Sequence, residues 1–401
     1  MKIAIIGQGY VGLSLAMAAA SKSEVIGFDH NRDLVNDLSK GISHIEGVAS
    51  KDLKHLASAS RYEATSDFSR LAEVDVVIIA VPTPLNPERK PDLSYIEQAC
   101  GVIGQYVSKP VLIINESTSH PGTLRNFIKP AIERCSQQSI EHRYAVAPER
   151  VNPGNSEFIQ KNTPRIVAGL TVNAAKEARA FYTQFCGEIV EVSTPEVAEA
   201  AKLFENTFRQ VNIALVNEFA QISHALGVSV QEVLEAANSK PFGFMKFNPS
   251  AGVGGHCIPV DPTYLAAAAE SHGASAALIR LSNDVNMGMA QYVVDRVVAD
   301  HSGSIAGISV LVVGVSYKAN VKDVRETAAA RIIESLRNQG AVVSWHDPLV
   351  QDWNGESSGP LLGADIAIVV TKHDSVDERE ILASAPYIFD TTGTIKGARG
   401  F

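Results

Sequence analysis

Short apolar runs alternate with helical patterns over the first half of the chain. Residues 2–6 and 25–28 are predicted as buried strands, with an alanine-rich helix at 13–20 between them. A near-continuous β-branched run at 74–81 has the composition of a central parallel strand. Further strands are expected at residues 111–114, 144–147 and 188–192. This alternation is typical of a doubly wound α/β domain built on a parallel sheet.

The period of the pattern changes after residue 194. From Pro195 to Leu226 the chain is predicted to form one long helix, because proline suits the first helical position and Gly227 follows the last. A second helical region is expected at 263–299. The long helix carries apolar residues on nearly every side, which favours burial on more than one side and hence a homodimer or higher homo-oligomer.

Near residue 305 the α/β pattern begins again. Three strands and a helix are expected at 309–314, 342–345, 364–370 and 327–338. The predicted fold class is therefore α/β, with two Rossmann-like doubly wound domains at 1–193 and 304–401. A central helical domain at 194–303 joins them and contains the long helix.

Composition agrees with several soluble domains. A chain of 401 residues is longer than one hydrophobic core usually serves, and 45% hydrophobic with 20% charged residues is ordinary for a globular protein. The formal net charge of -9 argues against a nucleic-acid surface. The chain begins directly with a strand, and no apolar run approaches the roughly 20 residues of a membrane span, so no membrane contact is expected.

The cysteine pattern bears on both metals and compartment. The four cysteines are scattered, without C-x-x-C pairs or metal-ligand spacing: Cys100, Cys135, Cys186 and Cys257. We therefore expect no metal site and free thiols in a reducing, cytoplasmic compartment.

The first strand runs directly into a G-x-G-x-x-G turn at residues 7–12, which opens the first helix. Its first glycine permits the tight turn, its second the close approach of a pyrophosphate, and its third the packing of helix on strand. The second strand ends at Asp29, which would accept hydrogen bonds from the ribose hydroxyls and repel a 2′-phosphate. The turn thus predicts NAD rather than NADP, although Arg32 lies close enough to weaken that preference.

Three successive strands end in polar, proline-stiffened loops. These loops lie at residues 82–84, 115–118 and 148–154. Ligands bind at the carboxyl ends of the strands in this architecture. One such loop alone is explained by a solvated turn, but three in register favour a binding site.

The stretch 252–262 carries the most reactive group of the central region. Its three glycines relieve backbone strain, and they are followed by Cys257 and by Asp261 between two prolines. Because proline does not extend a helix, both side chains are predicted on a rigid, non-helical loop. A thiol and a carboxylate displayed in this way suit covalent catalysis followed by activation of water. The alternative is a glycine-rich turn with a buried thiol.

Two further groups of polar residues are candidates. Lys202 and Asn206 share one face of the long helix, with Arg209 and Asn217 near it, unless this face is simply its solvated side. In the C-terminal domain, which lacks G-x-G-x-x-G, a basic loop suits a different phosphorylated ligand. Its candidate phosphate or sugar contacts are Lys318 and Arg325, unless they are only surface charges.

Taken in order, these motifs closely resemble the UDP-sugar 6-dehydrogenases, the family of UDP-glucose, GDP-mannose and UDP-N-acetylhexosamine dehydrogenases. Besides the N-terminal turn, the resemblance includes V-P-T-P at 81–84, E-S-T at 116–118, P-E-R at 148–150, Lys202 with Asn206, G-G-x-C-x-P-x-D at 254–261 and K-x-N-x-x-D-x-R at 318–325. UDP-glucose members usually carry G-G-S-C-F-P-K-D, whereas this chain has His256, Ile258 and Val260. The strings at 148–154, 201–209 and 211–218 look like the N-acetylhexosamine branch.

The resemblance implies oxidation of a primary alcohol at C6 to a carboxylate, with two NAD⁺, for surface polysaccharides. UDP-N-acetyl-D-mannosamine is the first choice of substrate, with UDP-N-acetyl-D-glucosamine or UDP-glucose as alternatives. In this reaction Cys257 would form a thiohemiacetal and then a thioester, while Lys202 and Asn206 stabilise the C6 oxygen. Asp261 and Thr118 would hold the attacking water, with Glu149 as acid/base partner. Asp261 could instead be a structural carboxylate that pairs with Lys202.

The resemblance also implies the residues that bind each ligand. The NAD contacts would be Gly7, Gly9, Tyr10, Val11, Gly12, Asp29, Arg32, Pro82, Thr83, Thr118 and Arg325. The UDP-sugar contacts would be Glu149, Arg150, Val151, Asn152, Lys202, Asn206, Arg209, Gly254, Lys318 and Arg325. A different class remains open from the fold alone, because hydroxyacid dehydrogenases combine a similar N-terminal domain with a helical one. They transfer one hydride without a nucleophilic thiol.

Overall fold

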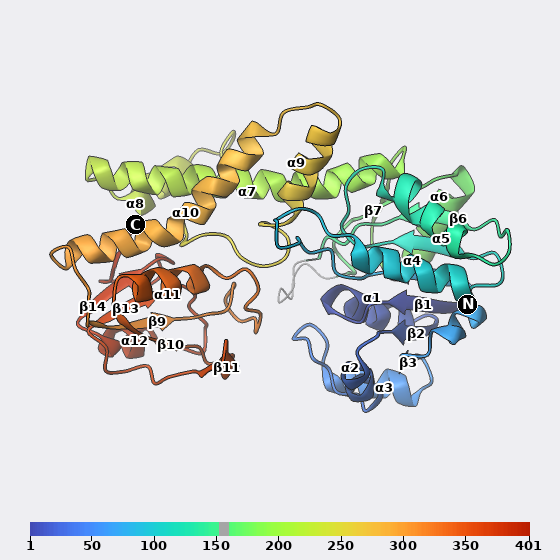
Figure 1. The fold of residues 1–401 in the computed structure, drawn as a ribbon, viewed down its shortest axis with the longest axis horizontal. Coiled ribbons are helices and arrows are strands. Elements are labelled where there is room, and N and C mark those ends of the chain that lie inside the picture. Colours follow the sequence, from blue (N-terminus) through green and yellow to red (C-terminus); the bar gives the residue numbers. More distant parts are fainter. Residues whose placement is uncertain (152–159) are drawn as a thin grey trace. The chain divides into compact units, whose positions relative to one another are not determined.

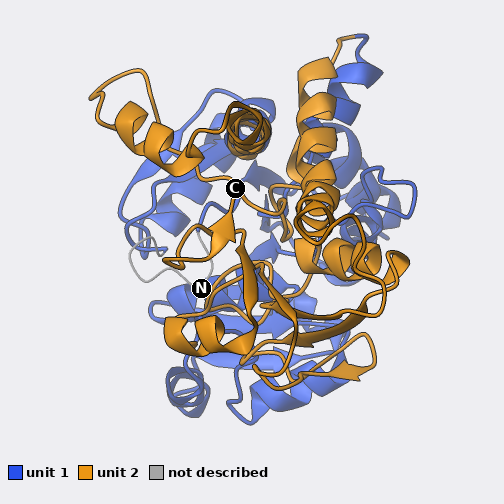
Figure 2. Ribbon diagram, turned by 90° about the vertical axis from the view of Figure 1, so that its left-hand side faces the viewer, with its two compact units in different colours: residues 1–205, 263–273 blue, residues 206–262, 274–401 orange. Residues whose placement is uncertain are grey.

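The computed structural model describes residues 1–151 and 160–401 and forms two compact units (Figures 1 and 2). The first unit consists of residues 1–205 with 263–273, and the second of residues 206–262 with 274–401. Each unit contains a doubly wound sheet of mostly parallel strands. The predicted α/β fold class is confirmed.

The described part of the first unit contains an eight-stranded sheet in the order β3-β2-β1-β4-β5-β6-β7-β8. Neighbouring strands are parallel except β6 and β7. The first six strands follow the order of a dinucleotide-binding fold. The strands are β1 (Lys2–Ile6), β2 (Glu24–Phe28), β3 (Tyr62–Thr65), β4 (Val76–Ile79), β5 (Leu112–Asn115), β6 (Arg143–Val146), β7 (Arg165–Gly169) and β8 (Ile189–Glu191).

Helices cover both faces of this sheet (Figure 1). Ile3 and Ile5 of β1 enter one apolar core, while Ala4 and Ile6 enter the other, as expected of a strand buried on both sides. The helical segments are α1 (Tyr10–Ala20), α2 (Arg32–Ser39), α3 (Ser50–Ser58), η1 (Phe68–Glu73), α4 (Ser94–Tyr106), η2 (Leu124–Ile128), α5 (Lys129–Cys135) and α6 (Val172–Tyr182).

The second unit contains a five-stranded parallel sheet in the order β10-β9-β13-β14-β15. Its strands are β9 (Ser309–Val313), β10 (Val342–His346), β13 (Ile366–Val369), β14 (Tyr387–Asp390) and β15 (Arg399–Gly400). A small antiparallel pair, β11 (Asp352–Trp353) and β12 (Glu356–Ser357), lies in the connection after β10. The helices of this sheet are α11 (Ala328–Asn338) and α12 (Glu378–Ser384).

The central helices are α7 (Pro195–Leu226), α8 (Val230–Asn238), α9 (Asp261–Ser271) and α10 (Ala277–Asp300). The bounds of α7 agree with the predicted helix. The helical region expected at 263–299 is instead two helices, because the chain turns at Gly273, whose φ is +75°. In the part of the chain that the structure describes, every helix is too short or too polar to cross a membrane.

Candidate active site

The G-x-G-x-x-G turn has the geometry that a dinucleotide requires. A Cβ on Gly7, whose φ is +92°, would lie 2.5 Å from the Ala80 carbonyl oxygen. A Cβ on Gly12 would lie 1.8 Å from the Gly7 carbonyl oxygen, so both positions need glycine. A Cβ on Gly9 would meet nothing within 4 Å, which leaves open space at the N-terminus of α1. Anionic phosphates are stabilised at such a helix end, so these residues fit bound NAD.

Asp29 is joined to this turn by its carboxylate. Its Oδ2 accepts a hydrogen bond from the Gln8 backbone N–H at 2.9 Å, and its Oδ1 accepts one from the Asn31 N–H at 2.9 Å. The buried Gln8 side chain in turn donates to the Ile5 carbonyl and accepts from the Tyr62 hydroxyl. Asp29 therefore holds the turn in place. Its side chain, just after the end of β2, is 11% exposed. Arg32, the first residue of α2, is exposed.

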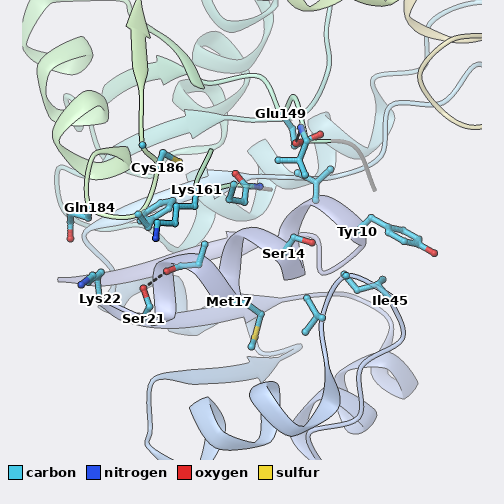
Figure 3. Close-up of a pocket in the computed structure, with 18 of the residues that line it drawn as sticks. Tyr10, Ser14, Met17, Ser21, Lys22, Ile45, Glu149, Lys161, Gln184 and Cys186 are labelled. Atoms are coloured by element: carbon cyan, nitrogen blue, oxygen red, sulfur yellow. Dashed lines mark hydrogen bonds between the residues drawn. The ribbon is translucent and has the colours of Figure 1, made fainter. Parts of the chain in front are cut away.

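A cavity of about 670 Å³ lies beside α1 (Figure 3). It is lined by four of the predicted ligand contacts, which come from distant parts of the sequence: Tyr10, Val11, Glu149 and Val151. Ser14 and Met17 extend this wall along α1, and Cys186 lies on another side. The first unit thus brings the loop after β6 next to the dinucleotide turn. Asn152 lies outside the described residues.

A buried ion pair contacts the residue that precedes the P-E-R loop. The Arg165 guanidinium lies 3.0 Å from the Glu116 carboxylate and donates to the Ala147 carbonyl at 3.1 Å. Burial raises the pKa of Glu116, and the charge of Arg165 offsets part of this rise. Tyr182 also donates to Glu116. Glu116 precedes Thr118 by two residues, and Ala147 precedes Glu149 by two, so this cluster anchors two of the predicted loops.

Arg150, predicted to bind the sugar nucleotide, has partners inside the first unit. Its Nη2 lies 2.6 Å from a carboxylate oxygen of Glu205, and its Nη1 donates to the Pro164 carbonyl at 2.7 Å.

Of the predicted contacts in the loops after β4 and β5, Thr83 and Thr118 are half-buried, while Pro82 is exposed. These loops leave the carboxyl ends of β4 and β5, as predicted.

Sequence reasoning missed Glu199, a buried carboxylate of α7. It accepts hydrogen bonds from the backbone N–H groups of Gly122 at 2.7 Å and Leu124 at 3.0 Å. Burial raises its pKa to about 7. Because Gly122 closes the loop that carries Thr118, Glu199 holds this loop against α7. Glu199 lies three residues before Lys202, and residues at that spacing share a helix face. This spacing could have identified Glu199 as a candidate from the sequence.

Lys202, Asn206 and Asn217 of α7 are buried, so the alternative that they lie on its solvated face is wrong, whereas Arg209 is exposed. Lys202 is 7% exposed and Asn206 is 6% exposed, and Asn217 is fully buried. The Asn206 amide donates to the Asp261 Oδ2 at 2.5 Å. Asn217 donates to Asn286 at 2.9 Å, which gives it a structural role.

Cys257 is exposed, so the alternative of a buried thiol is wrong. It lies on a non-helical turn, as predicted, and its carbonyl accepts from the Asp261 N–H at 2.9 Å. The placement of Asp261 on a non-helical loop is wrong, because α9 begins at this residue. Proline cannot continue a helix, but it is tolerated in the first turn, where its missing N–H has no helical partner, and Pro262 is in that turn.

The loop at 314–326 carries the basic residues predicted for the second ligand. It begins at Gly314, whose φ is +83°, and Gly254 packs against it. The pKa of Lys318 is lowered by burial and by the nearby charge of Arg209, so these two cations converge. Arg325 is 48% exposed, and its guanidinium pairs with Asp323 at 2.5 Å. A site with neighbouring cations at the carboxyl end of β9 suits a diphosphate.

Comparison with protein families matches three successive parts of the chain. Residues 1–186 match the UDP-glucose/GDP-mannose dehydrogenase family NAD-binding domain, and residues 196–288 match its central domain. Residues 311–397 match its UDP-binding domain. The chain belongs to the UDP-glucose/GDP-mannose dehydrogenase family.

Individual members of this family are similar over nearly the whole chain. The chain is 35% identical over 385 residues to UDP-N-acetyl-D-mannosamine dehydrogenase of Pyrococcus horikoshii, covering 93% of this chain and 90% of the relative. It is 35% identical over 356 residues to UDP-N-acetyl-D-glucosamine 6-dehydrogenase of Pseudomonas aeruginosa, covering 87% and 83%. The solved Pyrococcus horikoshii UDP-D-ManNAc dehydrogenase has a TM-score of 0.89 at 32% identity, covering 100% of this chain and 99% of that structure.

These findings confirm an NAD-dependent dehydrogenase of the nucleotide-sugar family, and the UDP-binding domain supports a UDP-sugar substrate. They also decide against the hydroxyacid dehydrogenase alternative. A 3-hydroxyisobutyrate dehydrogenase of Mycobacterium tuberculosis is only 17% identical, with a TM-score of 0.50 over 75% of this chain, so that likeness concerns the fold alone. The roles of individual site residues stay predictions.

Proposed function

We propose that this family member oxidises the C6 alcohol of a UDP-N-acetylhexosamine to the uronate, with UDP-N-acetyl-D-mannosamine as the preferred substrate. The observation that carries the proposal is the exposed Cys257 thiol, held one turn from an Asp261 carboxylate that Asn206 orients. A dehydrogenase that stops at an aldehyde needs no thiol. The named relatives that act on UDP-N-acetylhexosamines support the sugar, with UDP-N-acetyl-D-glucosamine as the alternative substrate.

Different residues serve the successive steps of the two oxidations. The glycine turn and Asp29 would hold NAD, which would supply the hydride acceptor for each oxidation. After the first, the Cys257 thiolate adds to the aldehyde carbon, and the C6 oxygen takes up a proton to give a thiohemiacetal. Loss of the second hydride and of the hydroxyl proton leaves a thioester. Lys202 and Asn206 donate to the C6 oxygen while it carries negative charge.

Hydrolysis of the thioester releases the uronate. Asp261 and Thr118 orient the water, and Glu149 takes its proton as the C–S bond breaks and the thiolate leaves. Asn206 fixes the Asp261 carboxylate through its 2.5 Å hydrogen bond. In the second unit, Lys318, Arg209 and Arg325 bind the diphosphate.

We further propose the division into domains at 1–193, 194–303 and 304–401. We also propose a cytoplasmic location, which the four free thiols favour.

Stoichiometry tests the four-electron reaction. Each UDP-N-acetyl-D-mannosamine consumed should yield two NADH, because the aldehyde stays in the site as the Cys257 adduct until it is oxidised. NADH absorbance and chromatographic quantification of the uronate measure both products. NADP⁺ should be a poor substitute, since Asp29 repels a 2′-phosphate. One NADH per sugar, with aldehyde released, would contradict the proposed mechanism.

We also propose a homodimer in which α7 contributes the contact. Exposed apolar side chains recur along one side of this helix at spacings of four and seven: Val197, Phe204, Phe208, Leu215, Ile222 and Leu226. Leu215 is 64% exposed and Phe204 is 65% exposed, which is unusual for large apolar residues unless a partner covers them. The opposite side of α7 carries its buried residues, among them Leu203, Asn206 and Asn217, so the exposed apolar stripe is a second apolar surface on the same helix.

Leu215→Glu should convert the dimer into monomer, because a charge in an apolar interface loses its hydration. Light scattering after size-exclusion chromatography measures the mass. His224→Glu is the matched control, since His224 is exposed on the opposite side of α7 and should leave the dimer intact. Equal masses for wild type and Leu215→Glu would refute this interface.

A further inference from the structure

In the second unit, the stretch that carries Cys257 packs directly on the loop at 314–326. The Gly255 N–H donates to the Arg325 carbonyl at 3.0 Å. A Cβ on Gly255, whose φ is +82°, would lie 2.7 Å from the Tyr317 ring. A Cβ on Gly254 would lie 2.8 Å from the Tyr317 Cβ. The two glycines are therefore required because the Tyr317 side chain lies against their backbone.

Tyr317 is itself fixed within its loop. Its N–H donates to the Asp323 carbonyl at 2.8 Å, and the Asp323 carboxylate accepts from the Arg325 backbone N–H at 3.0 Å. Burial raises the pKa of Tyr317 to about 12, with further contributions from Asp323 and Cys257. The phenol is thus uncharged at neutral pH, and Cys257 is one of the nearby groups that keep it so.

The same loop has the features of the diphosphate site. It leaves the carboxyl end of β9, where ligands bind in doubly wound sheets. Lys318, the residue after Tyr317, is half-buried beside Arg209. A diphosphate that engages Lys318 would restrict the backbone on which Tyr317 is carried. The Tyr317 ring would then transmit this restriction to Gly255, two residues before the nucleophile.

We infer that Tyr317 is a positioning residue for Cys257, and that UDP bound at the loop 314–326 fixes the thiol through the Tyr317 ring. The inference rests on the proposed function, because it takes Cys257 as the nucleophile and this loop as the UDP site. It adds a coupling between them: the UDP moiety of the substrate, which stays attached to the sugar and takes no part in the oxidation, positions the residue that does.

The rate at which iodoacetamide alkylates Cys257 measures this coupling without enzyme turnover. The experiment uses the full chain with Cys135→Ser, since Cys135 is the other exposed cysteine while Cys100 and Cys186 are buried. Mass spectrometry follows the modification with and without saturating UDP. UDP should slow alkylation about threefold or more, because a thiol held in one orientation is attacked less often.

Tyr317→Ala should abolish this effect of UDP while UDP still binds, as measured by calorimetry. It should also lower kcat and leave the KM for NAD unchanged. Tyr317→Phe is the matched control: it keeps the ring and should keep the UDP effect. If Tyr317→Ala loses the fold, Tyr317→Leu, which removes the ring and keeps an apolar side chain, decides the question.

Two outcomes would overturn the inference. One is a UDP effect of the same size in Tyr317→Ala as in wild type, which would mean that UDP shields the thiol directly. The other is wild-type alkylation that bound UDP leaves unchanged. Neither result would affect the proposed function, which instead fails if UDP does not bind or if Cys257 is dispensable for the second oxidation.

Discussion

The Cys257→Ser enzyme should bind NAD and the UDP-sugar as wild type does and then fail to produce uronate at a useful rate. The first hydride transfer does not involve the thiol, so in a single turnover only the first equivalent of NADH should form at the wild-type rate. The second oxidation requires a covalent adduct of the aldehyde. A serine hydroxyl is a far weaker nucleophile than a thiolate, and the ester that it forms hydrolyses slowly.

The loss in uronate formation should be about 10²–10⁴-fold, the range for removal of one participant in such a site. Rapid-mixing absorbance measures the NADH of the first turnover, and intact-protein mass detects a trapped sugar adduct on the serine. Cys135→Ser is the matched control, because Cys135 is also exposed but lies at the end of α5. It should retain wild-type turnover. A Cys257→Ser enzyme with near wild-type activity would refute the central role of the thiol.

Local chemistry explains which features could be predicted from the sequence. The bounds of α7 follow from a proline that starts a helix and a glycine that ends it, and both signals are local. The turn at residues 7–12 was recognisable because each glycine solves a separate steric problem, which the contacts of Gly7 and Gly12 show. The doubly wound sheets follow from alternating strand and helix patterns, which need no long-range information.

Contacts between distant segments were not predictable in this way. The turn at Asp261 illustrates the limit: two flanking prolines exclude a helix interior but do not exclude a helix start. Tyr317 has no unusual sequence context, and its role depends on a contact with Gly255, sixty-two residues earlier in the chain. Glu199 likewise acts on Gly122 through a contact that only the fold creates.

The buried pair of Asn206 and Asp261 raises the question of whether this carboxylate is catalytic or only structural. Both side chains are nearly inaccessible, at 6% and 3% exposure, and they share a hydrogen bond. Either role predicts damage from Asp261→Asn alone. In the catalytic role the thioester still forms, but its hydrolysis slows by about 10²–10⁴-fold because the water loses the carboxylate that orients it.

Exchanging the two residues separates these roles. In Asn206→Asp/Asp261→Asn the amide at 261 can donate to the carboxylate at 206, so the hydrogen bond and the buried charge are both retained. If Asp261 is structural, the exchange should restore stability and bring hydrolysis back toward the wild-type rate, short only of what the lost Asn206 amide contributes at the C6 oxygen. If Asp261 orients the water, thermal unfolding should return toward the wild-type midpoint while hydrolysis stays slow and the acyl-enzyme accumulates on Cys257. Intact-protein mass after quenching measures that acyl-enzyme, and we expect it in both Asp261→Asn and the exchanged variant. Full recovery of uronate formation in the exchanged variant would exclude a catalytic role for Asp261, because the only carboxylate left in the pair then lies on α7.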